Sequence, residues 1–343
     1  STPMLLLRMR RANKRMARIA VIGVGYWGRN LVRNFSALGV LASVCEPDGK
    51  SRAMVREKYP DVAVFEQPEA VFSDLKIDSV VIATPAEMHG ALARQALDAG
   101  KHVFVEKPLC LDVAEAETLK RLADEKGLVL MVGHLLLYHP AFRALLESVK
   151  SGGLGELRYI YSNRLSLGKI RREENALWSF APHDISMILQ LAGTIPRRVT
   201  ATGAHYLTDG VADTTLSHLV LGGNLQAHIY VSWLHPFKEQ KLVVVGEQAM
   251  IVFDDTKEAA EKLLLYRHRV GWDGAIPIVS KAAPEPIAFS ESEPLRNECQ
   301  AFLDAIDGIS HPPSDAAEGI RVLKVLEACQ RSILQGTAID LEA

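Results

Sequence analysis

The chain has 343 residues, of which 48% are hydrophobic and 23% charged, and 39 basic residues against 41 acidic ones give a net charge of −2. These values exclude wholesale disorder and a general nucleic-acid binder, and the length indicates about two domains whose core needs no disulfides. The four cysteines form no CxxC pair, so we expect no metal site. No apolar run is long enough for a signal peptide or a membrane span. We therefore expect a cytoplasmic protein with no nucleic-acid and no membrane partner.

Residues 1–17 form a basic leader. Arginine and lysine dominate residues 8–18, and no acidic residue precedes Glu46. We expect a disordered segment ahead of the first strand, and contact with an anionic partner is the alternative.

Residues 18–140 alternate strand-like and helix-like runs. Short apolar runs predict strands at residues 18–24, 41–45, 62–65, 79–83, 102–105 and 129–132. Helical periodicity separates them, up to residue 37 and over residues 50–58, 90–99 and 114–126. This rhythm predicts an α/β fold in which a doubly wound parallel sheet forms a Rossmann dinucleotide-binding domain.

The rhythm changes in residues 141–343. After a helix at 141–150, strands are predicted at residues 157–165, 198–206, 215–221, 226–234, 241–245, 250–254 and 261–269. Helices are predicted at residues 181–191, 294–306 and 316–330. Consecutive strands predict an α+β substrate domain with a large open, mostly antiparallel sheet, and its C-terminal helices are free to pack back on the first domain. The open sheet face predicts a homodimer or homotetramer.

A glycine-rich turn carries the first functional signal. Gly23, Gly25 and Gly28 form GxGxxG between a predicted strand and a predicted helix, and Glu46 ends the next strand. This is the dinucleotide fingerprint, in which backbone N–H groups face the pyrophosphate and the acid accepts hydrogen bonds from the ribose hydroxyls. The acid favours NAD over NADP, although nearby Arg52 keeps NADP open. A glycine turn that binds nothing is the alternative.

Other candidate cofactor contacts follow from position. The carboxyl ends of parallel strands face the cofactor, so loops there are candidates, and an ordinary turn is the alternative. These contacts are Tyr26, Trp27, Thr84, Pro85, His89, Glu106 and Lys107.

Lys107 is the candidate catalytic base. It follows Glu106 at the end of a buried strand. Partial desolvation beside a cationic nicotinamide would lower the pKa of such a lysine, so that it accepts a hydroxyl proton. A surface lysine paired with Glu106 is the alternative.

Four segments together carry a family resemblance: GVGYWG, the acid at Glu46, ATPxxxH over residues 83–89 and AGKHVFVEKP over residues 99–108. They resemble the Gfo/Idh/MocA oxidoreductases over the whole chain. The resemblance implies an NAD(P)-dependent dehydrogenase of a sugar, inositol or sugar nucleotide, with Lys107 as the proton-transfer residue and Glu106 steadying it.

The same family usually places an aspartate four residues before a histidine. Here His183 matches that histidine, and Ser179 stands where the aspartate is expected. Lys107 and His183 are therefore the expected acid–base pair, and an interior histidine is the alternative for His183. Neighbouring Asp184 is interpreted as an acid near a helix start.

Two segments are candidate substrate contacts. The first follows a Rossmann strand, and the second is an arginine-rich loop whose forked side chains suit an anionic substrate. A solvated loop, offset by its own acids, is the alternative. Besides Lys107 and His183, the candidate residues are His134, Tyr138, Asn163, Arg164, Arg171, Asn175 and Trp178.

The resulting hypothesis is an NAD-dependent dehydrogenase that oxidises C3 of a UDP-linked amino sugar or uronic acid. It is based on similarity to family members of nucleotide-sugar and surface-polysaccharide biosynthesis. An NDP-keto-sugar reductase and an inositol-type dehydrogenase are alternatives within the same class. A non-catalytic dinucleotide-binding regulatory protein is the alternative of another class, and Ser179 is the one feature that favours it.

Overall fold

The computed structural model describes residues 16–341, so nearly all of the predicted basic leader lies outside the described residues. Contacts divide the chain into two compact units. The first unit runs through Glu106 and adds Glu117–Met131 and Cys299–Pro312. The second unit comprises Lys107–Ala116, Val132–Glu298 and the chain from Pro313 onward. The predicted domain boundary at residue 140 stays a prediction.

The strands predicted in the first half form one six-stranded sheet with the order β3-β2-β1-β4-β5-β6. The neighbouring strands from β3 to β5 pair in parallel, as predicted. The strand order reverses between β1 and β4, and such a switch point is where doubly wound sheets bind ligands. The strands are β1 (Ile19–Ile22), β2 (Leu41–Cys45), β3 (Ala63–Phe65), β4 (Ser79–Ile82), β5 (His102–Glu106) and β6 (Leu130–Gly133).

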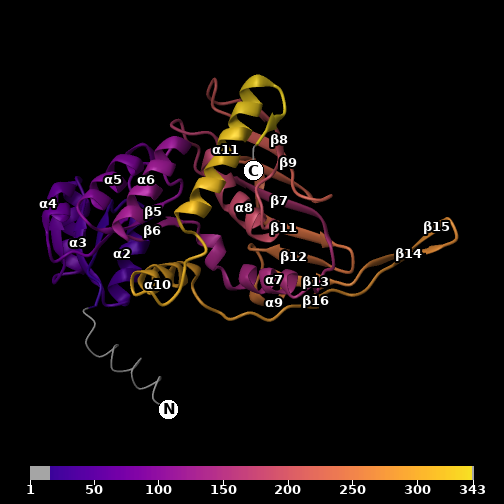
Figure 1. The fold of residues 1–343 in the computed structure, drawn as a ribbon, viewed down its shortest axis with the longest axis horizontal. Helices are drawn as coiled ribbons and strands as arrows, with labels where there is room; N and C mark the ends of the chain where they lie inside the picture. Colours follow the sequence, from indigo (N-terminus) through magenta and orange to yellow (C-terminus); the bar gives the residue numbers. More distant parts are fainter. Residues whose placement is uncertain (1–15, 342–343) are drawn as a thin grey trace, which may run out of the picture. The chain divides into compact units, whose positions relative to one another are not determined.

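Helices lie around these strands (Figure 1). The β1 and β4 strands are buried at every position, because helices cover a parallel sheet on both faces. Residues 68–73 were not predicted as a helix, although Pro68 stands in the first turn, where proline is favoured. The helices are α2 (Gly28–Ala37), α3 (Gly49–Lys58), α4 (Pro68–Ser73), α5 (His89–Asp98) and α6 (Val113–Lys126), with the short η1 (Ala86–Met88).

The second unit contains a nine-stranded sheet with the order β16-β13-β12-β11-β7-β10-β9-β8-β17. Within the described part of this sheet, β7 and β10 are the only neighbours that pair in parallel, which confirms the mostly antiparallel prediction. The strands are β7 (Leu157–Leu167), β8 (Arg198–Ala204), β9 (Thr214–Val220), β10 (Gln226–Ser232), β11 (Leu234–Gly246), β12 (Met250–Asp254), β13 (Leu263–Tyr266), β16 (Glu285–Pro286) and β17 (Ile339–Asp340).

One face of this sheet is covered by two helices. Because side chains alternate along a strand, β8, β9 and β10 each present a buried row of residues. Helix α8 packs on β7, β9 and β10, and α11 packs on β8 and α8. The remaining elements are α7 (Pro140–Lys150), α8 (Ala176–Ala192), α9 (Ala259–Lys262), α10 (Pro294–Ile306), α11 (Ala316–Gln335), η2 (Leu135–Tyr138) and a projecting hairpin of β14 (Arg269–Asp273) and β15 (Ile276–Ser280) (Figure 1).

Helix α8 begins five residues earlier than predicted. The Asn175 side chain caps it by accepting a hydrogen bond from Trp178 N at 3.1 Å. Pro182 lies inside the helix, where proline normally breaks the pattern, so the sequence pointed to a start near residue 181. This longer α8 carries both Ser179 and His183.

Candidate functional site

The glycine turn of the first unit requires glycine at two positions. Gly23 has a φ of +93°, and a Cβ there would lie 2.7 Å from Ala83 O. A Cβ on Gly28, the first residue of α2, would overlap Gly23 O. Around Gly25, by contrast, the space where a Cβ would lie is open. A ligand can therefore approach the backbone at Gly25, next to the N-terminus of α2.

The Glu46 carboxylate lies at the end of β2 and faces this turn. Its Oε2 accepts a hydrogen bond from Val24 N at 2.7 Å, and its Oε1 accepts one from Asp48 N at 2.9 Å. Glu46 is 8% exposed. Each carboxylate oxygen has a second lone pair, so the side chain holds the turn and can still accept ribose hydroxyls.

The guanidinium of Arg52 is engaged by protein groups. Its Nη1 donates to Glu46 O at 2.9 Å and to Pro47 O at 2.6 Å, and its Nη2 forms an ion pair with Glu66 at 3.1 Å. These contacts turn Arg52 toward protein acceptors, which disfavours its use for the 2′-phosphate of NADP.

Thr84 follows β4 and carries an unused polar atom. Its Oγ1 is buried without a hydrogen-bond partner among the described residues. The His89 ring nitrogen Nε2 lies 2.9 Å from Thr84 O and closes the turn through Pro85. A buried hydroxyl without a partner is costly, so it is a natural contact for a bound ligand.

Trp27 and Glu106 meet at the end of β5. Trp27 Nε1 donates a hydrogen bond to Glu106 Oε1 at 2.6 Å. Tyr26, the preceding residue, is 90% exposed. The open turn, the Glu46 carboxylate and the unused Thr84 hydroxyl together fit a dinucleotide with a free ribose 2′-hydroxyl.

In the second unit, Lys107 contacts the start of α8. Its Nζ donates a hydrogen bond to Ser179 O at 2.7 Å. A neutral carbonyl stabilises the ammonium form less than the carboxylate of an aspartate would. The position at which the family usually has an acid thus contributes its backbone oxygen here.

His183 lies one helical turn after Ser179, on the same side of α8. Its Nδ1 is buried and has no partner among the described residues. Burial first, and then the charges of Lys107, Arg164 and His134, hold the pKa of His183 well below 6.5. The imidazole is therefore neutral at neutral pH and has an unused ring nitrogen near Lys107.

The structure corrects the interpretation of Asp184 as an acid at a helix start. Asp184 lies inside α8 and is fully buried. Its carboxylate accepts hydrogen bonds from Ser162 Oγ at 2.6 Å and from Arg164 Nε at 3.0 Å and Nη2 at 3.2 Å. This ion pair ties β7 to α8 and engages the guanidinium that we predicted to bind substrate.

His134 and Tyr138 are each 1% exposed. His134 Nδ1 lies 2.6 Å from Glu318 Oε2, and the Tyr138 hydroxyl lies 2.7 Å from Ser314 Oγ. Burial is the main cause that raises the pKa of Tyr138. Tyr138 therefore stays a neutral phenol joined to the segment before α11.

The other predicted substrate residues also have protein partners. Asn163 donates to Glu239 at 2.7 Å, and Arg171 pairs with Glu174 at 3.1 Å. Asn175 and Trp178 share one acceptor, Gln330 Oε1, at 2.8 and 3.3 Å. Their roles in substrate binding stay predictions.

Sequence reasoning missed three polar partners in the second unit: Asp184 for Arg164, Glu318 for His134 and Gln330 for Asn175. Asp184 and Gln330 each lie within a helical pattern, where the sequence does not show what a side chain meets. Glu318 falls three residues after Asp315 at a helix start, a spacing that indicates only a cap.

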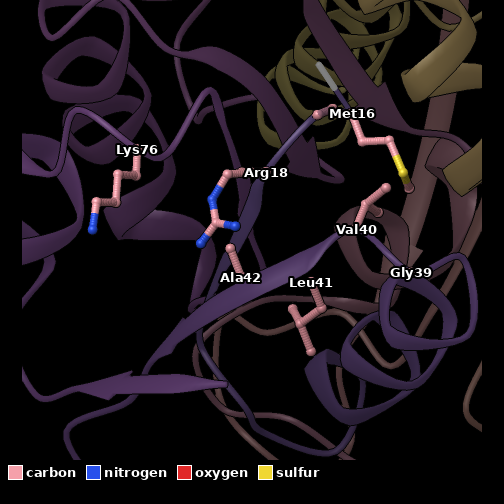
Figure 2. Close-up of a pocket in the computed structure, with 8 residues that line it drawn as sticks. Met16, Arg18, Gly39, Val40, Leu41, Ala42 and Lys76 are labelled. Atoms are coloured by element: carbon pink, nitrogen blue, oxygen red, sulfur yellow. The ribbon is translucent and has the colours of Figure 1, made fainter. Parts of the chain in front are cut away.

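A separate hollow lies elsewhere on the first unit (Figure 2). It is lined by Met16, Ala17, Arg18, Gly39, Val40, Leu41, Ala42 and Lys76. These residues lie near the amino-terminal ends of β1, β2 and β4, whereas dinucleotides bind at the carboxyl ends of strands. The hollow is therefore distinct from the candidate cofactor site.

Residues 16–341 hold no group of three or more His, Cys, Asp and Glu side chains arranged to hold a metal ion. None of the helices described there has the length and apolar character needed to cross a membrane.

Comparison with known proteins agrees with this geometry. A model of an oxidoreductase family with an NAD-binding Rossmann fold matches residues 17–134, and a GFO/IDH/MocA C-terminal domain model matches residues 142–252. The chain is 30% identical to UDP-N-acetylglucosamine 3-dehydrogenase of Acidithiobacillus ferrooxidans, over 89% of this chain and 94% of that protein. The solved structure of that enzyme superposes with a TM-score of 0.82, at 28% identity over 93% of this chain and 98% of the other. A scyllo-inositol 2-dehydrogenase (NADP(+)) of Bacillus subtilis is 26% identical, over 84% of this chain and 86% of that protein.

Proposed function

Since the chain belongs to the GFO/IDH/MocA family of oxidoreductases, we propose that it oxidises a secondary alcohol of a nucleotide-linked sugar, at C3 of a UDP-linked amino sugar or uronic acid. One observation carries the chemistry. Lys107 Nζ donates to the neutral carbonyl of Ser179, one helical turn from the unpartnered Nδ1 of neutral His183.

The protein is an NAD-dependent dehydrogenase that acts on CH–OH groups. NAD supplies the hydride acceptor when it is bound. Residues at the carboxyl ends of β1, β2 and β4 suit its binding: the backbone around Gly25 admits the pyrophosphate, Glu46 accepts from the ribose, and Thr84 offers a hydroxyl. The carboxylate of Glu46 would also repel a 2′-phosphate.

Lys107 is the proposed general base. In its neutral form, Nζ accepts the proton of the reacting hydroxyl while the hydrogen on the carbon leaves with its electron pair as hydride. Its backbone partner, Ser179 O, orients the amine without adding a negative charge that would favour the ammonium form. Neutral His183 has a ring nitrogen available to bind the same hydroxyl or to take on the proton.

A nucleotide-linked substrate is supported by the basic loop before α8 and by the name of the relative. Lys169 and Arg172 are exposed in this loop, and Arg171 is half-buried beside Glu174. Lysine and arginine bind phosphate groups. The relative with 30% identity is a UDP-N-acetylglucosamine 3-dehydrogenase. A role in surface-polysaccharide biosynthesis in the cytoplasm follows as part of the same proposal.

An inositol-type dehydrogenase is the second candidate, because a relative with 26% identity is a scyllo-inositol dehydrogenase. Polyols lack a pyrophosphate, so a preference for inositol would leave the basic loop without a ligand. A keto-sugar reductase uses the same residues in the opposite direction.

The test is native mass spectrometry of the purified protein, followed by NADH absorbance with a panel of UDP-sugars, dTDP-sugars and inositols. Reduction of NAD by one UDP-amino sugar or its uronic acid, with the ketone at C3 in the product, supports the proposal. Activity with inositols alone supports the second candidate. A protein that binds NAD but reduces none of it across the panel would favour a regulatory role.

A further inference from the structure

A buried histidine–glutamate pair in the second unit joins His134, a predicted substrate contact, to Glu318, which has no role assigned above. His134 follows β6 directly, and Glu318 stands in the first turn of α11. Nδ1 of His134 and Oε2 of Glu318 are 2.6 Å apart, and each side chain is only 1% exposed. The other oxygen of Glu318, Oε1, has no partner among the described residues. His134 is therefore the one hydrogen-bond partner of this carboxylate within residues 16–341.

The start of α11 is held close to β6. Val132 N donates to Ser314 O at 2.9 Å, and the Tyr138 hydroxyl lies 2.7 Å from Ser314 Oγ. Gly319, next to Glu318, allows this approach, because a Cβ there would lie 2.6 Å from Cγ2 of Val132. Glu318 thus lies between two backbone positions, Ser314 and Gly319, that both approach Val132 of β6.

The contact also fixes which nitrogen of His134 carries a proton. Glu318 stands in the first turn of α11, and Asp315 accepts a hydrogen bond from its backbone N–H at 2.8 Å. An ionised carboxylate only accepts hydrogen bonds, so Nδ1 of His134 must be the donor. The neutral ring then keeps an unprotonated Nε2 as a hydrogen-bond acceptor.

His134 lies close enough to His183 that its protonated form would lower the pKa of His183, as the charge of Lys107 does. The elements agree with this placement, because α8 packs on both η2, which starts after His134, and α11, which carries Glu318. The pair therefore belongs to the same side-chain cluster as Lys107 and His183.

We propose that Glu318 is a positioning residue: it holds His134 in the tautomer with a protonated Nδ1, so that Nε2 accepts a hydrogen bond from a donor group of the substrate beside the reacting hydroxyl. This proposal rests on the proposed function for the identity of the substrate. The substrate group that donates this hydrogen bond to Nε2 is a hydroxyl or an amide N–H. An N-acetylated amino sugar has both next to C3.

Steady-state kinetics on four variants test the coupling. Glu318→Gln keeps the size of the side chain and removes its charge, and loss of such an orienting partner typically costs about 10- to 100-fold in activity. His134→Asn should lose at least as much, and adding Glu318→Gln to His134→Asn should change kcat/KM no further. Glu327→Gln, a half-buried acid later on α11 that accepts from Val113 N, is the matched control and should keep wild-type activity. Independent, multiplicative losses in the double variant would overturn the proposal.

Nitrogen-15 NMR of histidine-labelled protein tests the tautomer without any substrate. His134→Asn identifies the His134 signals, and the wild type should show a protonated Nδ1 and an unprotonated Nε2. A doubly protonated ring, or a proton on Nε2 alone, would overturn the proposal even if Glu318→Gln failed to fold. A wild-type enzyme that oxidises no sugar would refute the proposed function, and the spectrum would still decide the role of Glu318.

Discussion

Replacing Lys107 by methionine tests whether the Lys107 amine is needed for turnover. Methionine keeps most of the length of the side chain and removes Nζ together with its 2.7 Å hydrogen bond to Ser179 O. Loss of a general base costs about 10²- to 10⁴-fold in turnover. That range corresponds to about 2.7–5.4 kcal/mol at 1.36 kcal/mol per factor of ten. The lost hydrogen bond contributes about 0.5–1.5 kcal/mol to stability, so the variant should melt at a lower temperature yet still fold.

The assay compares two replacements of Lys107 under single-turnover conditions. Lys107→Arg can still donate to the carbonyl of Ser179, but an arginine is always charged and cannot accept a proton. Both variants should therefore lose turnover at least a hundredfold, while NAD binding, followed by the fluorescence of Trp27 and the other tryptophans, stays near that of the wild type. Near-normal turnover of Lys107→Arg would refute the reasoning, because it would show that a positive charge is enough at this position.

Three further predictions concern stability, pH and assembly. Asp184→Asn should lower the free energy of unfolding of the second unit in urea by about 3–5 kcal/mol, because it removes the fully buried counter-charge of the partly buried Arg164. Asp340→Asn breaks an exposed ion pair with Arg198 and should cost far less, and equal losses would contradict the argument. Burial and the charges of Lys107, Arg164 and His134 lower the pKa of His183 from 6.5. As the pH falls below about 6.5, His183 therefore binds a proton in the unfolded chain before it does so in the folded one. The free energy of unfolding thus decreases as the pH falls. His183→Asn should flatten this loss between about pH 7.5 and pH 5.5 in urea titrations, and an unchanged slope would show that His183 is not its source. The open face of the nine-stranded sheet should form a homodimer or homotetramer, and a single monomeric mass in light scattering would refute that prediction.

The parts of the fold that follow local rules could be predicted from the sequence. Residues 79–82 form an unbroken buried run, and β4 occupies those residues. The hairpin of β14 and β15 is exposed at every position, so no burial pattern marks it. Strand β11 spans Leu234–Gly246, but its first half is mostly polar, and only residues 241–245 were predicted. Pairing with β7 extends that strand, and the residues of β11 alone do not predict this pairing.

The candidate site also contains residues that local sequence signals predict and residues whose partners depend on tertiary packing. The glycine turn, Glu46, Lys107 and His183 stand at fixed distances from strand or helix signals, so the sequence could name them. The sequence predicts that Arg164 binds an anion, because the contact with its actual partner, Asp184, depends on how β7 packs on α8. His134 and Glu318 are 184 positions apart in the chain, and only the close approach of α11 to β6 brings them together.

In the sequence, Ser179 in place of the usual aspartate is an argument against catalysis. The structure weakens that argument. A missing acid would weaken the case for an enzyme if Lys107 depended on that side chain for its orientation. In the structure the lysine donates to the carbonyl of Ser179, a group that every residue at this position would provide. Ser179 itself is 4% exposed, so the space of the usual aspartate is closed rather than open to water. The change therefore removes a negative charge from beside the amine while it keeps the amine in place, and a base that must be neutral to accept a proton benefits from that loss.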